Sequence, residues 1–62
     1  MSIHDYISII TALPNGQEFT AYQLFGHNYH ASLSLMRLCC VSNMPFERIG
    51  FTKNGANLYR RK

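Results

Sequence analysis

The residues with the clearest chemical potential are the basic side chains of the C-terminal half. Residues 37–62 hold six Lys or Arg and one acid, which gives +5, whereas residues 1–36 hold two acids and no Lys or Arg, which gives −2. Lysine and arginine neutralise phosphates, so this asymmetry predicts that the C-terminal half faces an anionic partner such as nucleic acid. The alternative is that these charges only keep the end of the chain soluble.

Several of these cations fall in a predicted hairpin, with strands at 46–51 and 57–61 around the turn signal Asn54-Gly55. Lys53, at the tip, is the best candidate for a phosphate contact. Arg60 and Arg61 are neighbours in a strand and point to opposite faces, so the cations of the hairpin cannot form one patch. Their alternative role is to stop an edge strand from aggregating.

A second set of polar residues belongs to a helix predicted from about His30 to Ser42. His30, Ser34 and Arg37 are spaced by four and three residues, so they share one face. Arg and Ser side chains suit base edges or phosphates, and His can donate to either. The alternative is an ordinary solvated face. The predicted DNA-contacting residues are Asn28, Tyr29, His30, Ser32, Ser34, Arg37, Lys53, Asn54, Arg60 and Arg61.

The same helix is unusually rich in apolar residues, which are Leu33, Leu35, Met36, Leu38, Cys39, Cys40 and Val41. They exceed what one narrow buried stripe needs, so we expect either deep burial or a partner, and most simply a homodimer. If the partner is another protein, we expect it on the apolar side around Leu35 and Leu38. Of the eight aromatic residues, most are expected in the core and Tyr29 is the one most expected at the surface.

Metal binding and catalysis have little support. His27, His30, Cys39 and Cys40 are the only ligand-rich group, but structural zinc sites usually separate their cysteines by two or more residues. Adjacent cysteines rarely form a disulfide with each other, and at least one is expected to be buried in the apolar run. No phosphate loop or nucleophile motif is present. We therefore expect no enzyme activity, no metal and no cofactor.

The elements that must position these residues follow from local signals. Ser2 can cap a first helix, in which Ile3, Tyr6, Ile7, Ile10 and Leu13 form an apolar face ended by Pro14-Asn15-Gly16. Residues 17–19 form a minimal strand. Thr20 then caps a second helix of about six residues, with Ala21, Leu24 and Phe25 inward and Gly26 as its stop.

The chain of 62 residues is expected to fold as one small domain in the cytoplasm, with no membrane span and no signal peptide. Helix, strand, helix, turn, helix and hairpin, with Phe19-Thr20, Gly26 and Asn54-Gly55 at the junctions, resembles the winged helix-turn-helix superfamily. The resemblance implies an α+β fold of three helices with a C-terminal β-hairpin wing. It also implies a small bacterial or phage transcriptional regulator, whose third helix and basic wing bind double-stranded DNA. The alternative is a protein-interaction module that modulates a partner without touching DNA.

Overall fold

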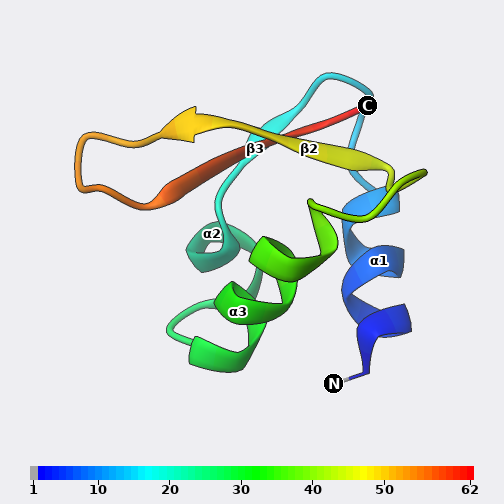
Figure 1. Ribbon diagram of the computed structural model, residues 1–62, viewed down its shortest axis with the longest axis horizontal. Coiled ribbons are helices and arrows are strands. Elements are labelled where there is room, and N and C mark those ends of the chain that lie inside the picture. The colour runs from blue at the N-terminus through cyan, green and yellow to red at the C-terminus, as the bar shows by residue number, and fades with distance from the viewer. Residues whose placement is uncertain (1) are drawn as a thin grey trace.

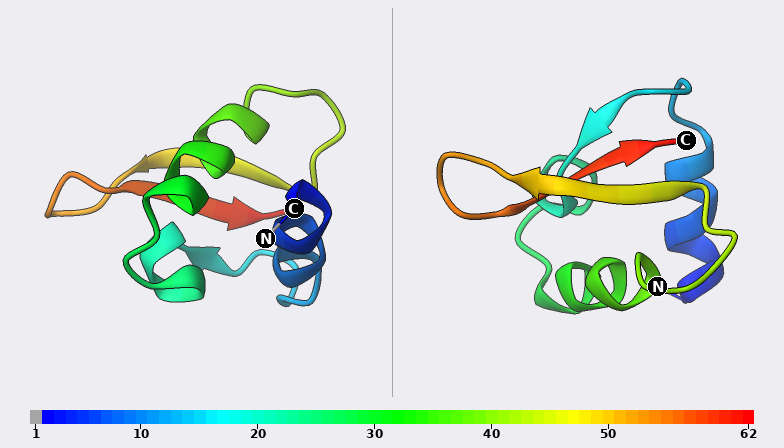
Figure 2. Two further views of the ribbon diagram at one scale, coloured as in Figure 1. Left: turned by 90° about the horizontal axis from the view of Figure 1, so that it is seen from below. Right: turned by 45° about the horizontal axis from the view of Figure 1, so that its top comes forward.

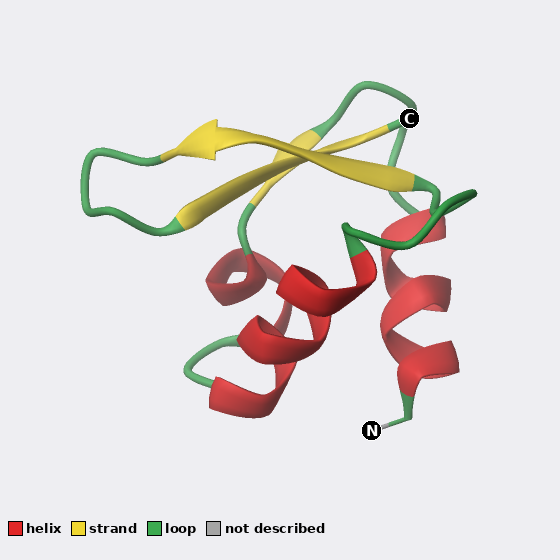
Figure 3. Ribbon diagram, in the orientation of Figure 1, coloured by secondary structure: helices red, strands yellow, loops and turns green. Residues whose placement is uncertain are grey.

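The computed structural model describes residues 2–62, which form three helices and a three-stranded antiparallel sheet, so the expected α+β class is confirmed. The helices lie on one side of the sheet, and the last two strands form a hairpin that extends past them (Figure 1). Figure 3 shows the same arrangement by element type. The elements are α1 (Ile3–Thr11), β1 (Glu18–Phe19), α2 (Ala21–Phe25), α3 (Tyr29–Leu38), β2 (Phe46–Phe51) and β3 (Asn57–Arg61).

The start of α1 is held by the expected cap. The Ser2 backbone N–H donates to the Asp5 carboxylate over 2.9 Å, and the Asp5 N–H donates back to the Ser2 hydroxyl over 3.4 Å. Hydrogen bonding of the carboxylate by the Ser2 backbone N–H, and next by the Ser2 side chain, holds the pKa of Asp5 below its ordinary value. Tyr6 and Ile10 bury the inner face of α1, whereas Ile3 is half exposed, so the predicted apolar face is confirmed except at its first position.

Capping side chains and a glycine also determine where α2 begins and ends and where α3 begins. Thr20 and Gln23 form a reciprocal capping box at the start of α2, with hydrogen bonds of 3.0 and 3.2 Å. Gly26 ends α2 at φ +69°, a conformation that glycine adopts without a steric penalty. The Asn28 side chain then accepts from the Ala31 N–H at 3.1 Å and caps α3. Only residues 26–28 separate the two helices.

The prediction that the third helix reaches Ser42 is wrong, because α3 ends at Leu38. The chain leaves it through tighter turns, in which Cys40 donates to Arg37 and Val41 donates to Leu38. Asn43 then takes a positive φ of 67°, which Asn tolerates better than most residues. Residues 39–43 therefore form a turn that leads into β2.

The sheet has the order β1-β3-β2, and both strands of the hairpin have the predicted bounds. Within the hairpin, Arg48 pairs with Tyr59 and Gly50 pairs with Leu58, so Ile49 is an extra residue that forms a bulge. The tip is a tight turn in which the Gly55 N–H donates to the Thr52 carbonyl at 3.0 Å. Gly55 itself has φ +83°.

The core lies between the sheet and the helices. Phe19, Phe46 and Tyr59 pack against one another from the three strands, with ring centroids 5.6–6.0 Å apart; Phe19 and Tyr59 are stacked, and Phe46 meets Tyr59 edge to face. Burial raises the pKa of the Tyr59 phenol. Tyr29 is 73% exposed, as expected, but Tyr22 and Phe51 are also largely exposed, so the core takes fewer aromatic residues than predicted. None of the helices described in residues 2–62 is both long and apolar enough to span a membrane.

Candidate nucleic-acid interface

The outer side of α3 is mainly apolar. Ala31, Leu35 and Leu38 are buried against the rest of the domain. At about 100° per residue, the positions of α3 opposite them are Tyr29, Leu33, Met36 and Arg37. The suggestion that Leu35 and Leu38 form a docking surface is therefore wrong, because both belong to the core. Of the apolar run from Leu33 to Val41, the exposed residues are Met36 in α3 and Cys40 and Val41 in the turn after it, and Tyr29 is a further exposed ring at the start of the helix.

The predicted polar residues of α3 are only partly available. His30, Ser32 and Arg37 are exposed, and Ser34 is half-buried on the flank of the helix. Asn28 is half-buried, and its side-chain oxygen is used by the cap of α3. Arg37 is thus the one formal cation that this helix offers to a partner.

The two cysteines follow α3 instead of continuing it. Cys39 is half-buried and donates from its thiol to the Met36 carbonyl, and Cys40 is exposed, so the expectation that one of them is buried is wrong. Desolvation is the main cause that raises the pKa of Cys39, and the neighbouring Cys40 adds to it. Among residues 2–62, no three His, Cys, Asp or Glu side chains gather as metal ligands would.

The hairpin presents a cation and an aromatic ring toward the side where the helices lie. Because of the bulge at Ile49, Arg48 and Phe51 project from the same face of β2, and the Arg48 guanidinium lies 5.0 Å from the centre of the Phe51 ring. Phe51 was absent from the predicted contacts, because the aromatic residues other than Tyr29 were mostly expected in the core; its exposure shows that this expectation is wrong for Phe51.

The tip of the hairpin carries Lys53 and Asn54, both exposed. Their backbone is fixed by hydrogen bonds across the turn, from Thr52 N–H to the Ala56 carbonyl at 2.8 Å and from Ala56 N–H to the Thr52 hydroxyl at 3.2 Å. Lys53 is therefore an exposed side chain on a hydrogen-bonded turn. This is the position that the sequence predicts for it.

Arg60 does not lie on the face of the sheet that carries Arg48. Arg60 pairs in register with Glu18 on one side and Glu47 on the other, on the outer face of the sheet. Its guanidinium lies 3.6 Å from the Glu47 carboxylate. The charge of this outer face is consequently balanced by carboxylates.

Arg61 is also placed apart from the others. Its guanidinium donates to the Pro45 and Thr11 carbonyls, each at 3.4 Å, and to the Lys62 carbonyl. These bonds join β3 to the end of α1, at the end of the sheet opposite the hairpin tip (Figure 1). Arg61 thus serves the packing of the domain.

Comparison with protein-family models, curated proteins and solved structures found no match to this chain. The function is therefore inferred from the chemistry of the surface residues. We use the name α3–hairpin face for the exposed side chains Tyr29, Met36 and Arg37 of α3 taken together with the exposed side chains Arg48, Phe51 and Lys53 of the hairpin.

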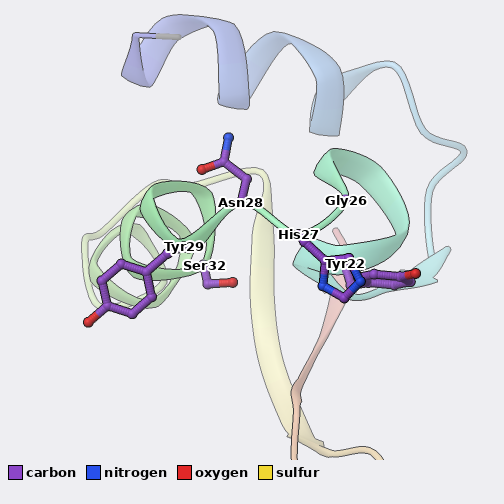
Figure 4. A pocket seen from close by; sticks show the side chains of 6 residues that line it. All are labelled: Tyr22, Gly26, His27, Asn28, Tyr29 and Ser32. Atoms are coloured by element: carbon purple, nitrogen blue, oxygen red, sulfur yellow. The ribbon is translucent and has the colours of Figure 1, made fainter.

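A hollow lies at one end of this face, between α2 and the start of α3. It is lined by Tyr22, Gly26, His27, Asn28, Tyr29 and Ser32 (Figure 4). Tyr22 and His27 pack edge to face at 4.6 Å, Ser32 points into the hollow, and Tyr29 points away from it. A second hollow runs from Tyr22 and His27 to the hairpin tip. The surface is therefore concave between the helices and the hairpin.

Proposed function

We propose that this chain is a small winged helix-turn-helix DNA-binding protein, a transcriptional regulator of the bacterial or phage type. In this proposal α3 enters the major groove and the β2–β3 hairpin is the wing beside it. The order of elements, the three-residue link at Gly26 and the sheet order β1-β3-β2 support it.

The observation that carries the proposal is the separation of charge. Arg37, Arg48 and Lys53 belong to the α3–hairpin face. All three carboxylates of the chain are used elsewhere: Asp5 caps α1, and Glu18 and Glu47 flank Arg60 on the outer face of the sheet. A surface with cations and no opposing carboxylates attracts a polyanion and speeds its association.

The dimensions of α3 agree with this role. An α-helix with its side chains is about 10–12 Å in diameter, and the major groove of B-DNA is about 12 Å wide, so the ten-residue α3 can enter it. One small module buries only about 600–1,000 Å² on DNA, so useful specificity generally requires two copies. We therefore include a homodimer on two half-sites in the proposal.

The direct test is fluorescence anisotropy with a labelled random-sequence duplex at low and moderate salt. Arg37→Glu reverses a charge within the proposed interface, and Lys62→Glu makes the same change in net charge outside it. We expect wild type and Lys62→Glu to bind and Arg37→Glu to lose most of its affinity. Equal losses in both variants, or wild-type binding that vanishes near physiological salt, would rule the proposal out.

A second candidate function is a protein-docking module. It is favoured by the exposure of Tyr29, Met36 and Val41, which leaves apolar side chains along and just beyond α3 without internal partners. The two functions compete for the same surface. A chain that binds no duplex, but whose α3 surface binds a protein and loses that binding on Met36→Asp, would select the second function.

A further inference from the structure

Phe51 is a large apolar side chain that the fold leaves in solvent. Its ring is 65% exposed, although it closes a strand that begins with the fully buried Phe46. Nothing in the core requires an aromatic ring at this position. It lies one residue before the turn that carries Lys53, at the free end of the hairpin (Figure 1).

The bulge determines where this ring points. Without the extra residue Ile49, the alternation that puts Phe46 and Arg48 on the inner face would place Phe51 on the outer face beside Glu47. With it, Phe51 joins the α3–hairpin face, and Arg48 lies against its ring at 5.0 Å. The cation–π contact is an attraction that favours this arrangement of the two side chains.

The end of the hairpin that carries the Phe51 ring is hydrogen-bonded and protrudes from the domain. The turn after Phe51 is closed by three hydrogen bonds of 2.8–3.2 Å among Thr52, Gly55 and Ala56. The hairpin extends beyond the helices in each view (Figure 2). A ring on this end can therefore reach a partner that also contacts α3, with Arg48 and Lys53 placed on either side of it in the sequence to hold phosphates.

We propose that Phe51 is an apolar wedge that enters between two adjacent base pairs and bends the bound duplex. This inference rests on the proposed DNA-binding function and adds a mode of recognition to it. Side chains such as Phe, inserted from the minor groove, partly unstack a base step and kink DNA toward the major groove. Pyrimidine–purine steps unstack most easily, so the preferred substrate is duplex DNA with such a step beneath the hairpin.

The experiment measures binding and deformation on the same DNA. One short duplex carries donor and acceptor dyes at its ends, and a second carries 2-aminopurine beside a central TA step. Binding is followed by anisotropy, bending by energy transfer, and unstacking by 2-aminopurine fluorescence. The variants are Phe51→Ala, Phe51→Leu, which keeps an apolar wedge, and Ile49→Ala, which removes another exposed apolar side chain of the same hairpin.

For wild type we expect a rise in energy transfer and in 2-aminopurine fluorescence on binding. Phe51→Ala should lose both signals and bind roughly tenfold more weakly, within the range expected for a lost base–aromatic contact. Phe51→Leu should keep part of both signals, and Ile49→Ala should match wild type. Circular dichroism of each variant verifies that the exposed position does not affect folding.

Three results overturn the wedge. Wild type that binds the duplex without bending or unstacking it refutes the wedge and leaves the proposed function intact. The same follows if Phe51→Ala deforms DNA as wild type does. If single strands bind more tightly than the duplex and Phe51→Ala removes that preference, Phe51 is a stacking platform for unpaired bases instead. Failure of wild type to bind any duplex is a separate result, which removes the proposed function itself.

Discussion

The salt dependence of DNA binding separates the cations that can reach a duplex from those that the fold holds elsewhere. Lys53→Ala removes a positive charge at the hairpin tip. Lys62→Ala removes the same charge at the opposite end of the sheet, where the Lys62 backbone N–H donates to the Pro45 carbonyl (Figure 1). The two variants have equal net charge, so a difference between them reports position.

The structure sets the expected magnitude. If Arg37, Arg48 and Lys53 each neutralise one phosphate, the slope of log affinity against log salt is about −2.7 per bound copy. Affinity should then fall roughly fortyfold between about 50 and 200 mM salt. Lys53→Ala should reduce the slope to about −1.8, and Lys62→Ala should leave it unchanged. Counting every Lys and Arg in the sequence predicts about −5.4 instead.

The assay is anisotropy of one labelled random duplex at several salt concentrations, with the number of copies per duplex fixed by titration at low salt. A slope near −5 per copy would refute the division of the cations into interface and structural groups. So would an equal change of slope in the two lysine variants, because that would mean that position on the fold has no influence.

Four further outcomes can be checked without DNA. Leu35→Ala, at a fully buried site, should lower the free energy of unfolding in urea by about 3 kcal/mol, and a loss below about 1 kcal/mol would contradict its place in the core. Thr20→Ala should lower it by about 1 kcal/mol, since the α2 cap is lost; an unchanged urea midpoint would show that the cap is not formed. Wild type should self-associate in sedimentation experiments at micromolar to millimolar concentrations and Met36→Asp should not, whereas a wild-type monomer throughout that range refutes this. A thiol reagent should modify exposed Cys40 before Cys39, which is half-buried and whose pKa is raised by desolvation, and mass mapping that finds the reverse order would contradict the placement.

The order and type of the elements could be predicted because their signals are local. A cap such as Ser2 or Thr20 acts within three residues, and Asn54-Gly55 specifies a turn between two alternating strands. These signals do not depend on the rest of the chain. The bounds of β2 and β3 and the short second helix were therefore predicted correctly, and β1 (Glu18–Phe19) is one residue shorter than the predicted strand at 17–19.

The residue at which α3 ends is determined by tertiary packing and not by a local sequence signal. The apolar run through Val41 has helical spacing, but β2 must begin at Phe46 so that its ring can join Phe19 and Tyr59. The chain needs residues 39–43 to turn, and the helix stops at Leu38. The spacing of apolar residues could not predict this turn, because the turn is required by contacts that β2 makes with β1 and β3.

The sequence alone determined that the C-terminal half is basic and that Lys53 lies at a hairpin tip, because composition and turn chemistry are properties of short segments. Only the tertiary structure decided which cations share a surface. Arg61 contacts Thr11, fifty residues away in the chain, and Arg60 lies between two carboxylates that come from different strands. The bulge at Ile49 likewise moved Phe51 to the other face of its strand. Each of these outcomes depends on which strand pairs with which and in what register, and that is settled only when distant segments pack together.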